Sequence, residues 1–215
     1  MDYLRYILFF TELVAMVAGF VYWDKVKNTP WKWFPVYLFF IFLFESTGEL
    51  LIYFSYDDIH LFMYDYIVIP MQFIFLYTLF YLQDRNENSK KWLIFLSSVY
   101  FASLCFEKIF LTGANDWFNQ FSYTIGVIGL VMLAIRYFDK LVHSESLLLF
   151  KSDMMFWVAS GILFFYLGTL PFYGVPDSLK GKMPHFMNMY WIATILLDMT
   201  MYILFTLGFI WKRQK

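Results

Sequence analysis

The stretch FPVYLFFIFLFESTGELLIYFS, residues 34–55, contains only two charged side chains, Glu45 and Glu49. Apolar runs of 18 or more residues with few charges are typical of transmembrane helices. A separation of four residues is about one turn of α-helix, so both carboxyl groups share a face. Because a charge inside hydrocarbon costs a few kcal/mol or more, such groups face the interior of a bundle or water. The stretch therefore predicts a membrane helix with one polar face turned away from lipid.

Similar apolar runs follow one another along the chain and are separated by short polar connectors. Of the 215 residues, 61% are hydrophobic and only 15% are charged, whereas about a quarter of the residues in a soluble domain are charged. The sequence therefore predicts an all-α, polytopic membrane protein with a single domain, residues 1–215, and no soluble catalytic domain. Seven transmembrane helices are expected, at about residues 4–23, 34–55, 61–83, 92–112, 120–138, 154–174 and 189–211.

The basic residues predict how this bundle is oriented. If there are seven spans, 12 of the 16 Lys and Arg residues fall at one end of the bundle. Short connectors rich in Lys and Arg stay in the cytoplasm. We therefore expect the N-terminus outside and the C-terminus in the cytoplasm. The twelve residues are Lys25, Lys27, Lys32, Arg85, Lys90, Lys91, Arg136, Lys140, Lys151, Lys212, Arg213 and Lys215.

The six acidic side chains within the spans all lie between the expected midplane and the outer surface, and polar residues such as Gln72 share their helix faces. Together they predict a polar cavity that opens to the outside and binds a cation, a proton or an amine-bearing ligand. An alternative stays open for each of them, because an intramembrane acid can also be structural and hydrogen-bonded to Tyr, Ser or Thr on another helix. The candidate cavity residues are Glu12, Glu45, Glu49, Asp65, Gln72, Glu107 and Asp198.

Two prolines interrupt predicted spans, Pro70 in the third and Pro171 in the sixth. Proline frees a backbone carbonyl and bends a membrane helix, so these positions are candidate hinges or static bends. The sequence contains no pair of histidines at metal-binding spacing and no glycine-rich phosphate loop, and we expect neither a metal nor a cofactor. The basic connectors are explained by membrane topology, so no nucleic-acid partner is expected.

Two segments carry a resemblance to a known group of proteins. NTPWKWFPVYLFFIFLFESTGELL, residues 28–51, and YDYIVIPMQFIFLYTLFYL, residues 64–82, resemble small uncharacterised bacterial seven-span proteins. That group is similar to the membrane sensory halves of some bacterial histidine kinases. The resemblance implies a location in the bacterial cytoplasmic membrane. Only four residues follow the seventh span, so we expect no attached output domain.

The leading functional hypothesis is a membrane receptor or sensor module, or an accessory subunit. Such a protein would act through a membrane or cytoplasmic partner, and we also consider a homo-oligomer. The alternative is a small transporter or channel for a cation, proton or amine, with Glu45 and Asp198 as coupling acids. A third hypothesis is an intramembrane enzyme, although no set of nucleophile and base is visible and no catalytic residue is proposed.

Overall fold

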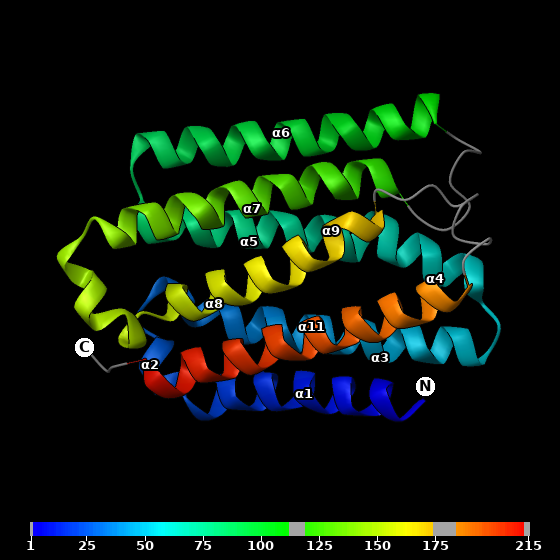
Figure 1. The fold of residues 1–215 in the computed structure, drawn as a ribbon, viewed down its shortest axis with the longest axis horizontal. Helices are drawn as coiled ribbons and strands as arrows, with labels where there is room; N and C mark the ends of the chain where they lie inside the picture. The colour runs from blue at the N-terminus through cyan, green and yellow to red at the C-terminus, as the bar shows by residue number, and fades with distance from the viewer. Residues whose placement is uncertain (1, 112–118, 174–183, 213–215) are drawn as a thin grey trace.

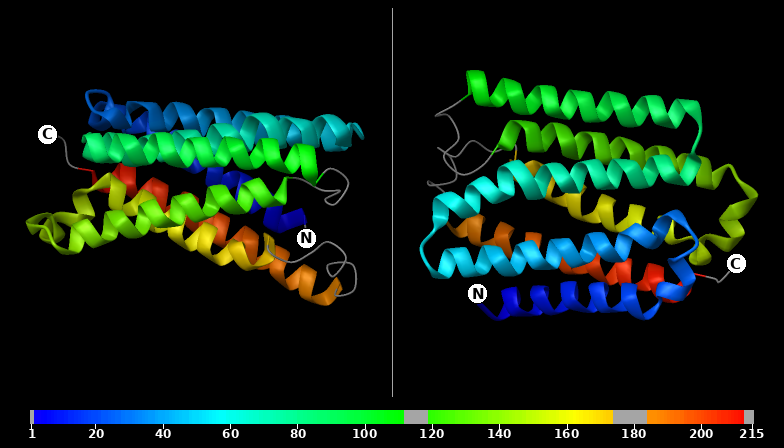
Figure 2. Two further views of the ribbon diagram at one scale, coloured as in Figure 1. Left: turned by 90° about the horizontal axis from the view of Figure 1, so that it is seen from above. Right: turned by 180° about the vertical axis from the view of Figure 1, so that it is seen from behind.

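The helices of this computed structural model lie side by side, roughly along one axis (Figures 1 and 2). The structure describes residues 2–111, 119–173 and 184–212. Within these ranges the secondary structure is helical throughout, with no strand. The α-helices are α1 (Asp2–Val21), α2 (Trp23–Val26), α3 (Trp33–Tyr53), α4 (Asp57–Met63), α5 (Ile69–Asp84), α6 (Glu87–Phe110), α7 (Gln120–Val142), α8 (Met154–Ile162), α9 (Gly168–Tyr173) and α11 (Pro184–Trp211).

Each of the seven predicted runs is helical in the structure, with ends that differ by a few residues. The local sequence explains one of these differences and also one helix start that agrees with the prediction. The Asn86 side chain accepts a hydrogen bond from the Ser89 amide, which starts α6 before the apolar run begins. The Asp153 carboxylate accepts one from the Met155 amide and fixes the first turn of α8. Polar capping residues therefore set helix ends that hydropathy alone places only approximately.

The structure supports a membrane protein with several crossings. Among the described residues, six helices are long and apolar enough to cross a membrane. They cover Tyr3–Val21, Pro30–Tyr53, Asp57–Asp84, Glu87–Phe110, Met154–Pro171 and Asn188–Trp211. Helix α7 is not among these six, so the count of seven stays a prediction. In space, α7 runs alongside α5 and α6, and α1 begins at the opposite end of the bundle from the end of α11 (Figure 1).

A π-helical turn precedes each of the two prolines. One covers Tyr64–Val68, just before Pro70, and the other covers Leu163–Leu167, just before Pro171. A proline cannot donate to the carbonyl four residues earlier, and its ring clashes there. In each case that carbonyl belongs to a residue of the π turn, where the backbone is wider than in an α-helix. The hinge role proposed for these prolines is untested, but both lie beside a local change in helical geometry.

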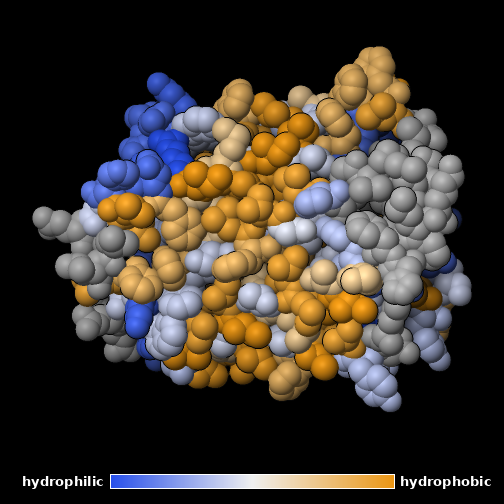
Figure 3. All heavy atoms as spheres, viewed as in Figure 1, coloured by the Kyte–Doolittle hydropathy of each residue, from blue (hydrophilic) through white to orange (hydrophobic). Residues whose placement is uncertain are grey.

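The ends of several helices meet at the end of the bundle where α11 finishes, and basic side chains hold them together. Lys25 donates to the backbone carbonyl of Ile210, at 2.6 Å. Lys140 pairs with Asp84 between α7 and α5. Arg136 lies over the Trp92 ring, 5.5 Å from its centroid. This end, where α6 begins, is hydrophilic in Figure 3, and an apolar band covers the middle of the same face.

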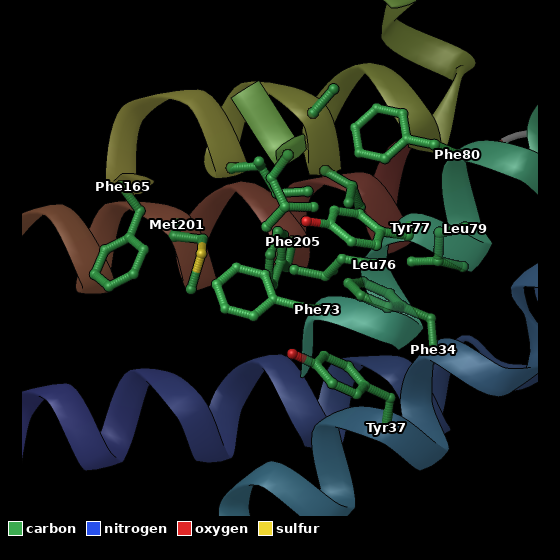
Figure 4. Packing of buried hydrophobic residues seen from close by; sticks show 14 of the residues in the cluster. Phe34, Tyr37, Phe73, Leu76, Tyr77, Leu79, Phe80, Phe165, Met201 and Phe205 are labelled. Atoms are coloured by element: carbon green, nitrogen blue, oxygen red, sulfur yellow. The ribbon is translucent and has the colours of Figure 1, made fainter. Parts of the chain in front are cut away.

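Aromatic rings fill the interior on the side of the bundle where α3 begins and α11 ends. The Tyr37 and Phe75 rings stack at 4.1 Å, and Phe34 packs edge-on against Phe205 at 5.1 Å (Figure 4). Phe34 and Phe205 are almost fully buried. Because lipid tails are as apolar as these rings, this contact stabilises the fold through close packing rather than through the hydrophobic effect.

Close approach of α5 and α7 depends on two glycines of α7. A Cβ atom at Gly126 would lie 2.6 Å from the Phe73 ring, and one at Gly129 would lie 2.5 Å from the Tyr77 hydroxyl. That hydroxyl donates to the Gly126 carbonyl at 2.8 Å. The two helices can therefore pack around these aromatic rings only because both positions lack a side chain.

We predict that Gly126→Ala destabilises the bundle by about 1–3 kcal/mol, the usual cost of overpacking a filled interior. Thermal unfolding of the purified protein in detergent measures the effect. Met132→Ala on the exposed face of the same helix is the control and should change the midpoint little. Equal midpoints for Gly126→Ala and the wild type would contradict the role given to this glycine.

Candidate functional site

A cavity of about 720 Å³ lies between α1, α3 and α11. Four of the seven candidate residues line it, from three helices that are far apart in the sequence: Glu12, Glu45, Glu49 and Asp198. Apolar side chains such as Leu8, Phe9 and Ile195 form much of the remaining wall. Small-molecule sites have volumes of about 300–1,000 Å³ and combine apolar walls with a few polar groups. The size and the lining both match such a site.

Glu12 is the least solvent-exposed acid of this cavity, with only 5% of its surface exposed. It interacts electrostatically with Glu45 and Asp198, and Tyr202 lies within hydrogen-bonding reach of its carboxyl group. Its other oxygen, Oε2, has no hydrogen-bond partner within the described part of the chain. A buried acceptor without a partner costs about 1–3 kcal/mol, so a hydrogen bond from a further donor would stabilise this carboxyl group.

Glu45 has a tyrosine partner because the chain carries a glycine beside it. Gly48 lies one turn further along the same helix, and a Cβ atom there would be 3.0 Å from the Tyr64 ring. The bare backbone lets this ring pack against α3, with its hydroxyl within hydrogen-bonding reach of the Glu45 carboxyl group. Tyr64 begins the π turn Tyr64–Val68. The turn before Pro70 thus supplies a polar partner for an acid of the cavity.

A positively charged side chain of the protein itself, that of Arg5, lies at the mouth of the cavity. The Arg5 guanidinium lies 3.0 Å from the Glu49 carboxylate, and both side chains are about half exposed, at 46% and 52%. The same guanidinium lies over the ring of Trp191, 6.0 Å from its centroid. A carboxylate and an aromatic face together form the usual environment for an organic cation in a protein.

The other three candidate residues lie outside this cavity, so the expectation of one shared cavity needs correction. Both oxygens of Glu107 accept hydrogen bonds at 2.8 Å, from the amides of Phe121 and Ser122. Asp65 accepts one hydrogen bond, at 3.4 Å, from the backbone amide of Asn119. These acids cap the first turn of α7, where free amides and the helix dipole favour negative charge. Their arrangement is that of a structural cap.

Gln72 also belongs elsewhere. Its amide nitrogen donates to the Tyr166 hydroxyl at 2.6 Å, within the aromatic interior between α5 and the π turn Leu163–Leu167. Tyr166 is almost fully buried. This contact joins the two proline-containing helices and has no part in the cavity described above.

Sequence reasoning missed Arg5 as a member of the site. Arg5 is not among the candidate cavity residues, although Arg5, Phe9 and Glu12 recur at the spacing of one helical face. On α11 the polar stripe of Trp191, Thr194 and Asp198 is visible in the sequence, and all three residues line the cavity. The spacing of Arg5 and Glu12 along α1 likewise indicates that Arg5 lies on the face of this helix that lines the cavity.

Comparison of the chain with protein-family models, with curated proteins and with solved structures gives no match. Within the described residues, no three acidic, histidine or cysteine side chains form a group that could hold a metal ion. His185, one of the three histidines, has a side chain outside the described part.

We predict that Glu107→Gln lowers the stability of the protein by about 1–3 kcal/mol. The glutamine oxygen can still accept one hydrogen bond, but its NH₂ group would face the second backbone N–H and leave that donor without an acceptor. The thermal unfolding midpoint in detergent measures this loss. Glu49→Gln, at a half-exposed acid of the cavity, serves as the control and should shift the midpoint less. A larger shift for the control would show that Glu107 has no special structural role.

Proposed function

We propose that this protein is a membrane receptor or sensor module that binds an amine-bearing organic cation in the cavity between α1, α3 and α11. The observation that carries the proposal is Glu12, a nearly buried carboxyl group that lines that cavity and has one oxygen without a hydrogen-bond partner among the described residues. An ammonium group supplies the missing donor and balances the nearby acids Glu45 and Asp198. The apolar and aromatic walls suit the carbon skeleton of an organic ligand.

We further propose seven crossings, with α7 as the seventh, and a cavity that faces the outside. Helix α7 has 23 residues, and a membrane helix needs about 20. An odd number of crossings agrees with the opposite positions of the start of α1 and the end of α11 (Figure 1). The described basic connectors gather at the α11 end, which favours the cytoplasm for that end. The membrane would be the bacterial cytoplasmic membrane.

Signal transfer to a partner is proposed to run through α11. This helix contributes Asp198 to the cavity and packs against α1 and α8. At its far end, the Trp211 ring lies 4.6 Å from the Trp157 ring, and Lys25 bonds to the carbonyl of Ile210. A shift of α11 on ligand binding would therefore change the surface of the cytoplasmic end. A membrane or cytoplasmic protein, such as a kinase, would read that change.

A receptor is favoured over the transporter alternative by the packing beyond the cavity. The stacked rings of Tyr37 and Phe75, together with Phe34 and Phe205, fill the bundle toward the cytoplasmic end. A transported cation would have to cross this aromatic layer. Binding without transport is the behaviour that such an arrangement supports.

Binding and flux measurements on the same protein test this proposal. We expect phenethylamine to bind saturably to the purified protein in nanodiscs and to weaken about tenfold or more in Glu12→Gln and Asp198→Asn. Glu87→Gln, at the other end of the bundle, is the matched control and should bind normally. The same protein in liposomes should show no uptake of the amine. Uptake that depends on Glu12 would favour a transporter, and no saturable binding would refute the ligand class.

The proposed orientation makes its own prediction. In a Cys105→Ala background, an impermeant thiol reagent added from outside should label Asp57→Cys and Ser178→Cys. It should not label Glu87→Cys or Glu145→Cys until the membrane is opened. Labelling of Glu87→Cys in intact cells would reverse the orientation, and the cavity would then face the cytoplasm.

A further inference from the structure

We propose that Arg5 is a built-in competitor at the mouth of the cavity, and that the ligand is an extended organic dication, such as a linear diamine. One ammonium group of this ligand would replace the Arg5 guanidinium between Glu49 and Trp191. The other would reach the deep acids Glu12 and Asp198. This inference rests on the proposed function, because it names the class of amine that the same cavity binds.

The cavity offers two separate levels for positive charge. The outer level consists of Glu49 and Trp191, where Arg5 lies at 3.0 Å and 6.0 Å from its two partners. The inner level consists of Glu12 and Asp198, which interact electrostatically with each other. Arg5 supplies the outer level with a cation. Among the described residues that line the cavity, no second basic side chain reaches the inner level.

The two levels are separated by the same length on two different helices. On α1, seven residues separate Arg5 from Glu12, which corresponds to about 10 Å of helix. On α11, seven residues also separate Trp191 from Asp198, again about 10 Å. Walls of Leu8, Phe9 and Ile195 and neighbouring apolar groups lie between these levels. Two amines joined by a chain of methylene groups match this pattern of charged ends and an apolar middle.

Replacement of Arg5 by a ligand is energetically accessible. The Arg5–Glu49 pair is about half exposed on both sides, at 46% and 52%, and exposed ion pairs contribute little to stability. The incoming ammonium keeps the charge on Glu49 paired and keeps a cation over the Trp191 ring. Release of the long Arg5 side chain also restores its conformational freedom. The exchange therefore loses little at the outer level, and the inner level gains a cation.

Two probes of the same length separate the dication from a simple amine. We expect 1,8-diaminooctane to bind the wild type in nanodiscs about tenfold or more tightly than octylamine, by isothermal titration calorimetry. Glu49→Gln should remove this advantage by weakening the diamine alone. Glu12→Gln should weaken both probes. Arg5→Gln should strengthen the diamine about threefold, the order of magnitude of an exposed ion pair.

The control is Lys90→Gln, which removes a basic residue at the other end of the bundle and should leave the affinity for both probes unchanged. Equal affinity for the two probes, or weaker diamine binding in Arg5→Gln, would overturn this inference while leaving the cavity as a site for a single amine. If neither probe binds saturably, or if Glu12→Gln has no effect on either, the proposed function fails as well. Arg5→Gln alters an exposed side chain, and an unchanged unfolding midpoint would verify that it folds.

Discussion

The structure depends on one constraint, that a carboxyl group inside a hydrocarbon layer must find donors within the protein. The bundle satisfies this constraint in different ways on its two sides. Around α7, Glu107 and Asp65 accept from backbone amides at a helix start. Around α1, α3 and α11, the acids gather at a cavity and are only partly supplied with donors. In the first arrangement backbone amides supply donors to the acids, whereas in the second one oxygen of Glu12 has no hydrogen-bond partner among the described residues.

Along its length, the bundle also divides into a densely packed region and a region that encloses a cavity. Toward the end of α11, aromatic rings such as Phe34 and Phe205 fill the interior. Toward the start of α1, the helices enclose space, and charged groups line it. The long helix α11 belongs to both regions. The proposed receptor role fits this combination, because a helix shared by a cavity and a distant surface can couple the two.

Much of the fold could be predicted from hydropathy, because all seven apolar runs are helical in the described residues. The convergence of Glu12, Glu45, Glu49 and Asp198 also agrees with expectation from depth and helical spacing. Asp65 and Gln72 lie outside this cavity, although a seven-residue spacing places two residues on one face of a regular α-helix. The π turn Tyr64–Val68 contains Asp65 and the first part of this interval, and a π turn takes more residues than an α turn. Regular helical periodicity applied across such a turn therefore assigns Gln72 to the wrong face. In the sequence, only Pro70 indicates the π turn.

The close contact at Gly48 has a consequence for how sequences of this fold can vary. Because a Cβ atom at Gly48 would lie 3.0 Å from the Tyr64 ring, a larger residue at position 48 requires this ring to shift or a smaller residue to replace it. The paired change would leave Glu45 without its hydroxyl partner. Positions 45, 48 and 64 are therefore expected to covary as a unit across related chains. Loss of the glycine alone would be the rarest of their combinations.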